Sequence, residues 1–378
     1  MPQIRVLNVI TDTNFGGAGR LLVNYLKNFD REKFDIEVAI PENSLLTPEI
    51  KKLGYRVIET KFGADKSFEK EAVRELMRII KEEKPDIVHA HASLSARFAA
   101  YFCGIKSRIY TRHCYYDLSK RDTTFPKKQI TGFINNLLST EIIAVADAAK
   151  QNLLDTGVSE KKITVIVNGV EQMRIADKDE IASLRKSMGV KDTEFLVAIS
   201  ARLEPVKGHD TFLKAAKIVC DKCDDAKFMI MGTGSLANAL KETAKEYGIS
   251  DKVIFTGLLS DVSGHVNAMD LNVNCSYGTE TSSLALSEAM SVGKPALATD
   301  FGGNPYMITD GVNGYLYPTH DADKLAELIL KIKDDKELYG KLSDGALKCY
   351  REKFTAKKMT EKLEEVYISE YEHRCGKK

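Results

Sequence analysis

The sequence lacks an excess of charge of either sign, because 55 Lys and Arg residues stand against 54 Asp and Glu residues. This balance creates no field over the whole chain that would select nucleic acid or an anionic membrane. Any such preference must come from a local patch. Nucleic acid is therefore not expected as a partner.

Long apolar runs are also missing. No stretch approaches the roughly 18 continuous apolar residues that a membrane-spanning helix needs. The chain opens with MPQIRVLNVI, a strand-like segment without the basic region and cleavage site of a secretion signal. We expect a cytoplasmic protein whose association with membrane, if any, is peripheral, at the inner face.

Cysteines are few and scattered, at positions 103, 114, 220, 223, 275, 349 and 375. Their odd number and scatter favour reduced thiols over a disulfide framework. Cys220 and Cys223 form a CxxC with no second pair nearby, which indicates a structural role rather than zinc or redox chemistry. His89 and His91 are two imidazoles on one strand without an acidic DxD-type pair, so we expect no metal and no other cofactor.

The 378 residues, 43% of them hydrophobic, suit two domains with a core each. Short runs rich in Val and Ile alternate with longer amphipathic segments, which is typical of parallel strands and their crossover helices. The predicted strands are IRVLNVI, FDIEVAI, YRVIET, DIVHAH, SRIYTRH, EIIAVA and ITVIV in the first half, and FLVAIS, KFMIMG, KVIFTG, LNVNCS and PALAT in the second. Helices are predicted where Phe68, Ala72, Leu76 and Ile79 or Ile80 recur, and over 237–247.

This alternation predicts an α/β protein with two Rossmann-like, doubly wound parallel sheets. We place the first domain at residues 1–170, a polar linker at 171–187 and the second domain at 188–354. After residue 321 only helices are predicted, ending in one over 355–371. Because open α/β sheets bind ligands beyond the carboxyl ends of their strands, we expect the active site in the cleft between the two domains.

A glycine cluster, Gly16-Gly17-Ala18-Gly19, follows the first predicted strand and precedes a helical run. Glycines let the backbone approach a ligand closely, and helix-start amides attract anions. The spacing is not that of a dinucleotide fingerprint. We assign Gly16 and Gly17 to ligand contact, although a bare turn between a strand and a helix would look similar.

The segment 278–318 is the most specific part of the sequence. It contains Glu280 and Glu288, the second on a helix predicted to start at Ser282 or Ser283. Eight residues of helix rise span roughly 12 Å, about the reach from a hexose to the ribose of a nucleotide sugar. The amides of Ser282, Ser283 and Leu284 would meet the diphosphate between them.

These features together resemble the retaining GT-B glycosyltransferases of family 4, whose signature is E-x7-E. The resemblance extends in order over nearly the whole chain, through PDIVHAH, VIVNGV, ARLEPVKG, MGTG and GNPYMITDGVNGYL. It implies two Rossmann-like domains facing each other across a cleft, with the last helix, at about 355–371, crossing back to the first domain. It also implies a nucleotide-diphosphate sugar as donor.

The family's site residues can be carried over by position. Arg202 and Lys207 match the basic pair that binds the donor diphosphate, and Glu280 and Glu288 match the contacts to the transferred sugar and the ribose. His113 matches a histidine near the reaction centre. The resemblance therefore implies catalytic roles for His113, Arg202, Lys207 and Glu280. Further positions on the donor side are Gly232 in MGTG and Gly257 in KVIFTG. Arg20, which follows the glycine cluster at a position where the family often has Glu, is assigned to the acceptor side.

A basic patch occurs at Lys120, Arg121, Lys127 and Lys128, interleaved with Phe125 and followed by Ile130, Phe133, Leu137 and Leu138. This pattern fits an interfacial surface that reaches a lipid-linked acceptor, with Lys127 and Lys128 on the acceptor side. It also fits a surface loop followed by a helix that faces the core, which we favour.

We expect a retaining transferase that moves a sugar, most readily from a UDP-sugar, to a hydroxyl on a glycan or a lipid-linked glycan. An epimerase or a phosphorylase of the same architecture would differ in its dependence on an acceptor. A non-catalytic binding module would bind the donor without transferring or hydrolysing it.

Overall fold

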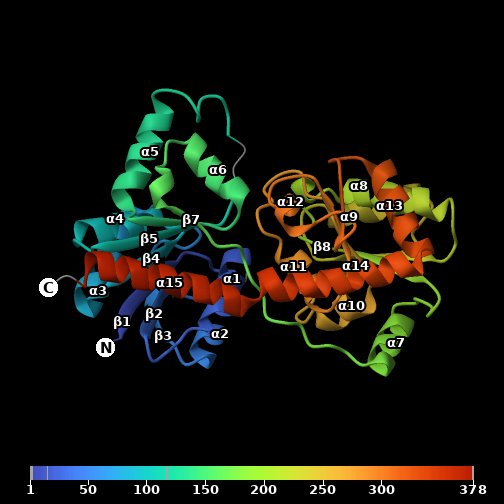
Figure 1. Cartoon of the computed structure of the whole chain (residues 1–378), viewed down its shortest axis with the longest axis horizontal. Coiled ribbons are helices and arrows are strands. Elements are labelled where there is room, and N and C mark those ends of the chain that lie inside the picture. The colour runs from blue at the N-terminus through green and yellow to red at the C-terminus, as the bar shows by residue number, and fades with distance from the viewer. Residues whose placement is uncertain (1–2, 15, 116–117, 377–378) are drawn as a thin grey trace. The chain divides into compact units, whose positions relative to one another are not determined.

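The structure is a computed structural model that describes residues 3–14, 16–115 and 118–376. The chain divides into two compact units, Met1–Gly169 with Ala356–Lys378, and Val170–Thr355. Each unit is built on its own parallel sheet, and Figure 1 labels the helices and some of the strands.

In the first unit, the described residues form one sheet of seven strands in the order β3-β2-β1-β4-β5-β6-β7, all of them parallel. The strands are β1 Ile4–Ile10, β2 Phe34–Pro41, β3 Arg56–Thr60, β4 Ile87–His91, β5 Ser107–Arg112, β6 Glu141–Ala144 and β7 Ile163–Val165. The helices are α1 Gly17–Leu26, α2 Thr47–Lys52, α3 Lys70–Glu83, α4 Leu94–Phe102, α5 Lys127–Leu138, α6 Asp147–Asp155 and α15 Ala356–Arg374, with a 3-10 turn at Glu160–Lys162.

The β1 side chains alternate between two apolar layers because successive residues of a strand point to opposite faces. Val6 and Ile10 pack on one face, with α1 and α15, whereas Leu7 and Val9 pack on the other, with α3 and α4. Helix α15, red in Figure 1, returns from the far end of the chain and contacts α1 and β5. The C-terminal segment thus completes the core of the first unit.

In the second unit, the described strands form a six-stranded parallel sheet in the order β10-β9-β8-β11-β12-β13. The strands are β8 Phe195–Ser200, β9 Ala226–Met231, β10 Val253–Gly257, β11 Leu271–Asn274, β12 Ala296–Thr299 and β13 Gly314–Tyr317. The helices are α7 Lys178–Ser187, α8 His209–Cys220, α9 Ala237–Glu246, α10 Ser263–Ala268, α11 Leu284–Ser291, α12 Asn304–Met307, α13 Ala322–Asp334 and α14 Lys336–Cys349, with a 3-10 turn at Pro205–Lys207 and a π-helical turn at Tyr350–Phe354.

The prediction of two doubly wound parallel α/β sheets is confirmed. In each sheet the strand order reverses direction at one point, between β1 and β4 in the first and between β8 and β11 in the second. The carboxyl ends of the strands at such a switch point border the usual ligand-binding crevice of an open α/β sheet.

Three local differences from the sequence expectations have clear causes. The segment 171–187, expected as a linker, contains α7, whose Asp177 side chain accepts a hydrogen bond from the Glu180 amide and so caps the helix. Phe68 lies outside α3, is 53% exposed and contacts the Phe98 ring edge-on. Strand β13 was not predicted, because it begins with a glycine, which weakens a strand pattern.

Candidate active site

The carboxyl ends of β8 and β11 bring together two of the charged residues assigned to catalysis. Lys207 Nζ lies 3.0 Å from Glu280 Oε2, although the two residues are 73 positions apart. Both side chains are largely buried, with 15% and 9% of their surface exposed. The pair therefore places one positive and one negative group side by side in a site with little water.

The Glu280 carboxylate accepts two further hydrogen bonds, from Asn274 Nδ2 at 3.2 Å and from Ser276 Oγ at 2.8 Å. Burial acts to raise the pKa of Glu280, but the Lys207 charge and these bonds outweigh it and hold the pKa below the ordinary value of 4.5. Glu280 is therefore ionised at neutral pH and oriented by three donors.

Sequence reasoning missed Asn274 and Ser276. Both lie in LNVNCS, which was recognised as a strand with a polar end. An Asn and a Ser at the carboxyl end of a buried strand next to the switch point were the available signal.

Glycines hold the two loops of this site close together. Gly208 has a φ of +67°, and a Cβ there would lie 2.2 Å from the Cys275 carbonyl oxygen. The Tyr277 amide donates to the Val206 carbonyl at 3.0 Å. The Lys207 turn is thereby fixed against the loop that follows β11.

The loop carrying Glu280 is also packed against Gly302 and Gly303. A Cβ at Gly302 would lie 2.1 Å from the Glu280 carbonyl oxygen, and one at Gly303 would lie 1.4 Å from that of Thr281. Any larger residue must push the loop away. These two glycines are a second feature that sequence reasoning did not assign to the site.

Helix α11 begins at Leu284, and Ser283 is its N-cap, as the sequence predicted to within a residue. The Ser283 hydroxyl accepts from the Leu286 amide at 3.4 Å and from Asn274 Nδ2 at 3.3 Å. Glu288 lies on α11 with only 5% of its surface exposed. Glu288 is therefore not a solvent-facing glutamate.

Three donor-side positions remain, two glycines and Arg202, and packing requires a glycine at only one of them. Gly232 has a φ of +136°, and a Cβ there would lie 2.2 Å from the Ala201 carbonyl oxygen, so its close approach to β8 requires glycine. Gly257 has a φ of +70° with open space around it. Arg202 is exposed just after β8, five residues before Lys207.

In the first unit, the glycine cluster opens α1. Gly16 is the N-cap and Gly17 the first helical residue, and a Cβ on Gly17 would meet nothing within 4 Å. By contrast, a Cβ on Gly19 would lie 2.6 Å from the Leu46 side chain. Packing thus explains Gly19, whereas Gly16 and Gly17 are exposed at the helix start. Arg20 follows on the same helix.

His113 directly follows β5 and is part of a buried polar cluster. Its Nε2 lies 3.0 Å from His91 Nδ1 on β4. Burial lowers the pKa of His113 to about 4 and that of His89 to about 3, so both rings are neutral at pH 7. Within the described residues, no group of three or more His, Cys, Asp or Glu is arranged to hold a metal ion.

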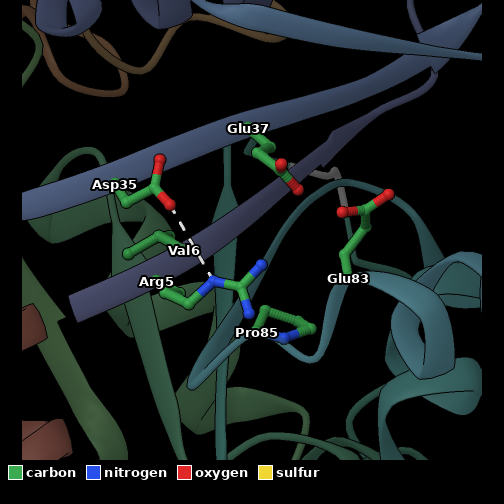
Figure 2. A pocket seen from close by; sticks show the side chains of 6 residues that line it. All are labelled: Arg5, Val6, Asp35, Glu37, Glu83 and Pro85. Carbon is green, nitrogen blue, oxygen red and sulfur yellow. Dashed lines mark ion pairs between the residues drawn. The ribbon is translucent and has the colours of Figure 1, made fainter. Parts of the chain in front are cut away.

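The hollow in Figure 2 lies at the amino ends of the strands of the first sheet, whereas His113 lies at the carboxyl ends. Arg5 and Asp35 are register partners near the amino ends of β1 and β2, and Arg5 Nε lies 3.8 Å from Asp35 Oδ2. Glu37 and Glu83 are both paired with Arg56. Each carboxylate of this hollow is thus paired with an arginine, and ligands of such sheets bind at the other end of the strands.

Comparison with known proteins identifies the family of the chain. The model of "Glycosyl transferases group 1" matches residues 180–348, and that of "Glycosyltransferase Family 4" matches residues 15–174. The UDP-Gal:alpha-D-GlcNAc-diphosphoundecaprenol alpha-1,3-galactosyltransferase of Escherichia coli is 25% identical over 97% of both chains. The N-acetyl-alpha-D-glucosaminyl L-malate synthase of Bacillus anthracis is 26% identical over 77% of both.

Among solved structures, Anabaena Alr3699/HepE in complex with UDP and glucose superimposes with a TM-score of 0.83 at 20% identity, covering 97% of this chain and 100% of that one. This likeness concerns the fold, which is that of the GT-B enzymes. The two family models together span both units, so the chain belongs to the family 4 glycosyltransferases and is a nucleotide-sugar-dependent transferase.

Proposed function

We propose that this enzyme transfers a sugar from a UDP-sugar to a hydroxyl of a glycan or lipid-linked glycan, with retention of the anomeric configuration. The observation that carries the proposal is the buried pair of Lys207 and Glu280 at the switch point of the second sheet. A sugar nucleotide presents hydroxyls and a diphosphate next to each other, and this pair offers an acceptor and a cation at matching positions. The UDP-sugar named for the E. coli relative supports the choice of nucleotide.

In the proposed donor complex, Glu280 accepts hydrogen bonds from sugar hydroxyls, and Lys207 turns from Glu280 towards the diphosphate. Arg202 adds a second positive charge, and the start of α11, with Ser282, Ser283 and Leu284, contributes its amides. Glu288, further along α11, holds the ribose. Gly232 and Gly257 let the backbone approach the donor, as Gly16 and Gly17 do at the start of α1.

The proposed chemistry is a displacement on one face of the sugar. The bond between the anomeric carbon and the phosphate oxygen breaks as the acceptor oxygen bonds to the same face, and the acceptor proton passes to the departing phosphate. Lys207 and Arg202 stabilise the charge that develops on that phosphate. His113 lies beside the transferred sugar.

A panel of nucleotides tests the donor assignment. UDP should raise the melting temperature more than GDP or ADP, because a ligand that binds only the folded state stabilises it by mass action. The anomeric proton coupling in the product, measured by NMR during the first turnovers, should show the configuration of the donor. Inversion, or consumption of donor that does not depend on an acceptor, contradicts the proposal.

The acceptor is proposed to reach the enzyme along the α5 surface, which we define as Phe125, Ile130, Phe133 and Leu137 together with Lys120, Arg121 and Lys128. The four apolar side chains are 79%, 55%, 67% and 38% exposed. The helix expected to face the core therefore turns most of its apolar side chains outward, and the favoured sequence interpretation was wrong on this point.

The inward face of α5 explains this orientation. Gly132 packs so tightly that a Cβ there would lie 2.3 Å from the Gly157 carbonyl oxygen. Asn135 and Asn136 bind Arg97 and the Gly157 carbonyl, and Leu138 is buried. Glycine and amide contacts thus hold the inward face of the helix, and most of its apolar side chains remain exposed to solvent.

The basic part of the α5 surface is smaller than the sequence suggested. Lys127 forms an ion pair with Asp122, which lowers the pKa of Asp122 to about 2. Lys120, Arg121 and Lys128 provide the positive charge beside exposed apolar side chains, a combination that suits anionic lipid. No helix in the described ranges is long and apolar enough to cross a membrane. We therefore propose peripheral contact with a membrane that holds the acceptor, as the diphosphoundecaprenol in the E. coli relative's name supports.

A further inference from the structure

The two carboxylate oxygens of Glu280 have very different surroundings. Oε2 accepts three hydrogen bonds, from Lys207 Nζ at 3.0 Å, from Ser276 Oγ at 2.8 Å and from Asn274 Nδ2 at 3.2 Å. Oε1 accepts none from any residue that the structure describes. Because an unpaired acceptor on a buried side chain costs free energy, a bound group that donates to Oε1 is favoured.

The orientation of the Asn274 amide is fixed by three contacts. Its Oδ1 accepts from the Ser276 backbone amide at 2.9 Å, and a backbone N–H can only donate. Nδ2 therefore points the other way, and its two hydrogens are donated to Glu280 Oε2 and to Ser283 Oγ, at 3.2 and 3.3 Å. Since Ser283 is the N-cap of α11, Asn274 connects the Glu280 carboxylate to the start of that helix.

The three donors to Oε2 differ in mobility. Lys207 Nζ lies at the end of a long flexible side chain, and in the proposed donor complex it turns towards the diphosphate. Asn274 and Ser276 have short side chains at the end of β11 and are only 9% and 2% exposed. Both therefore stay on Oε2 when Lys207 leaves, and they keep the carboxylate from rotating.

We propose that Asn274, together with Ser276, is a positioning residue that binds Glu280 Oε2 and thereby presents Oε1 to a ring hydroxyl of the transferred sugar. Asn274 acts through Glu280 and does not itself touch the sugar. This role rests on the proposed function, because it takes the transferred sugar as the ligand of Glu280. A ring hydroxyl donates to Oε1, whereas a ring position that carries fluorine cannot.

The donors around Oε2 also determine the effect of Glu280→Gln. In that variant the amide oxygen takes the place of Oε2, because every group around this place donates, and the amide nitrogen takes the place of Oε1. The atom that faces the sugar then donates and no longer accepts. The variant should therefore lose the preference for a hydroxyl over fluorine at the recognised ring position.

Donor analogues measure this preference. Initial rates are compared between UDP-galactose, UDP-glucose and UDP-N-acetylglucosamine and analogues of each in which one ring hydroxyl is replaced by fluorine. At one ring position, or at two neighbouring ones, the hydroxyl-to-fluorine ratio of kcat/KM should be at least about tenfold larger in the unaltered protein than in Glu280→Gln, because a hydrogen bond to a charged group is lost. The intrinsic effect of fluorine on reactivity is common to both proteins and cancels. Equal ratios at every position overturn the proposal.

Two variants test the positioning itself. Asn274→Asp keeps the acceptor for the Ser276 amide but replaces the donor to Oε2 by a negatively charged oxygen, while Lys207, the charged neighbour of Glu280, is unchanged. The like charge raises the pKa of Glu280, so the acid limb of kcat/KM should move to higher pH. At pH 7.5, kcat/KM should fall about 100-fold, with the affinity for free UDP changed less than about twofold.

Ser276→Ala removes a second donor to Oε2 without adding charge. It should move the acid limb in the same direction as Asn274→Asp, but by less, because a lost hydrogen bond to the carboxylate also raises its pKa. An acid limb that stays in place in both variants refutes the positioning role.

Asn272 provides the matched control. It lies on the same face of β11 as Asn274, is only 1% exposed and donates to the Ala285 carbonyl, not to Glu280. Asn272→Asp should lower the melting temperature at least as much as Asn274→Asp and leave the acid limb in place. An equal shift of the limb in both variants would indicate general disruption and overturn the proposal.

Titration of the unliganded protein separates the role of Asn274 from the proposed function. With ¹³C-labelled glutamate carboxyls, and the Glu280 signal assigned by its loss in Glu280→Gln, the pKa of Glu280 should lie below 4.5 in the unaltered protein and should rise in Asn274→Asp. An equal pKa in the two proteins overturns the hold of Asn274 on Oε2. If the unaltered protein turns over no UDP-sugar, the proposed function and the sugar as ligand fail together, and the hold on Oε2 still stands or falls on this titration.

Discussion

A single lysine decides whether the buried Glu280 can remain charged. In Lys207→Met, the attraction to the ammonium is lost, and burial should raise the pKa of Glu280 above 4.5. Leaving a carboxylate buried without its partner should cost about 3 kcal/mol of folding free energy at neutral pH. Denaturant unfolding of both proteins measures this loss.

The pH dependence of that loss follows from the sign of each shift. In the unaltered protein the lowered Glu280 pKa contributes stability above the unfolded-state value, which disappears as the pH falls through the folded-state pKa. In Lys207→Met the pKa of Glu280 is raised instead, so the ionised carboxylate destabilises the fold. The difference in free energy of unfolding between the two proteins should therefore be largest at neutral pH and should narrow as the pH falls below 4.5. Lys217→Met, which breaks the exposed pair with Asp221, is the control and should cost less than about 1 kcal/mol. A gap independent of pH contradicts this account.

Substitution of Glu280 and of Glu288 should have different effects on turnover and on nucleotide binding. Glu280→Gln keeps the size of the side chain but loses the charged acceptor for sugar hydroxyls, so turnover should fall strongly while free UDP binds nearly as well. Glu288→Gln should instead weaken free UDP by about 1 to 3 kcal/mol, the cost of a lost hydrogen bond to a charged group. Calorimetric titration with UDP beside initial rates separates the two. Loss of UDP binding in Glu280→Gln but not in Glu288→Gln would mean that the donor lies the other way round.

Sequence reasoning placed these residues on the elements where the structure has them, but it could not predict which of them contact each other. Lys207 and Glu280 were each assigned to the donor from their motifs, yet the ion pair between them depends on two loops that meet only in the folded sheet. The same holds for Asn274 and Ser276, whose role depends on where Glu280 points. Spacing along the chain predicts which end of a strand carries a residue, and it does not predict the contacts made across strands.

At the scale of elements, the position of the loop after β11 depends on Gly302 and Gly303, which follow β12 and pack against it. Gly303→Ala should misplace the Glu280 loop because the new Cβ would lie 1.4 Å from the Thr281 carbonyl oxygen. Gly303 has an ordinary φ of −92°, so the effect is steric rather than conformational. A displacement of about 1 Å at a catalytic group can cost about 100-fold, and we expect kcat/KM to fall by that order.

Gly340→Ala is the control for this prediction because its Cβ would meet nothing within 4 Å in the middle of α14. It should keep full activity and gain up to about 1 kcal/mol of stability, since alanine favours helix over glycine. Equal activity of the two variants would show that the Glu280 loop does not depend on this contact.

Strands and helices with a strong period were predictable, and α5 shows where such reasoning stops. The strands of both sheets contain short apolar runs rich in Val and Ile, and α3 buries Ala72, Leu76, Ile79 and Ile80 as its pattern predicts. In α5 the apolar residues also recur at helical spacing, but the structure buries the opposite face through Gly132 and two asparagines. Periodicity identifies an apolar face and does not say whether the protein's own core is its partner.

For the whole molecule, the overall charge is close to balanced, so an attraction to lipid has to come from a local patch, and the α5 surface is the one proposed here. Its two components should respond differently to salt. Lys120→Glu with Lys128→Glu should weaken binding to anionic vesicles at least about 30-fold at low ionic strength, because each basic residue near such a surface is worth about 1 kcal/mol. The loss should shrink as salt screens the charges.

Ile130→Ser with Phe133→Ser tests the apolar component on the same vesicles. Removing two exposed side chains that would enter the lipid should weaken binding about tenfold or more at every salt concentration, because burial of an apolar side chain contributes about 1.5 to 3 kcal/mol. Both side chains are more than half exposed in the structure, so the substitution leaves no cavity and should not lower the melting temperature.

A matched charge change outside the α5 surface completes the test. Lys178→Glu with Lys191→Glu alters the net charge by the same amount at exposed positions of the second unit and should leave vesicle binding close to that of the unaltered protein. Co-sedimentation with vesicles of phosphatidylglycerol and with neutral vesicles, at two salt concentrations, compares all four proteins. If the control pair weakened binding equally, the attraction would depend on net charge alone and not on the α5 surface. If the unaltered protein did not bind, the membrane would drop out of the proposal, and the acceptor would be a soluble glycan.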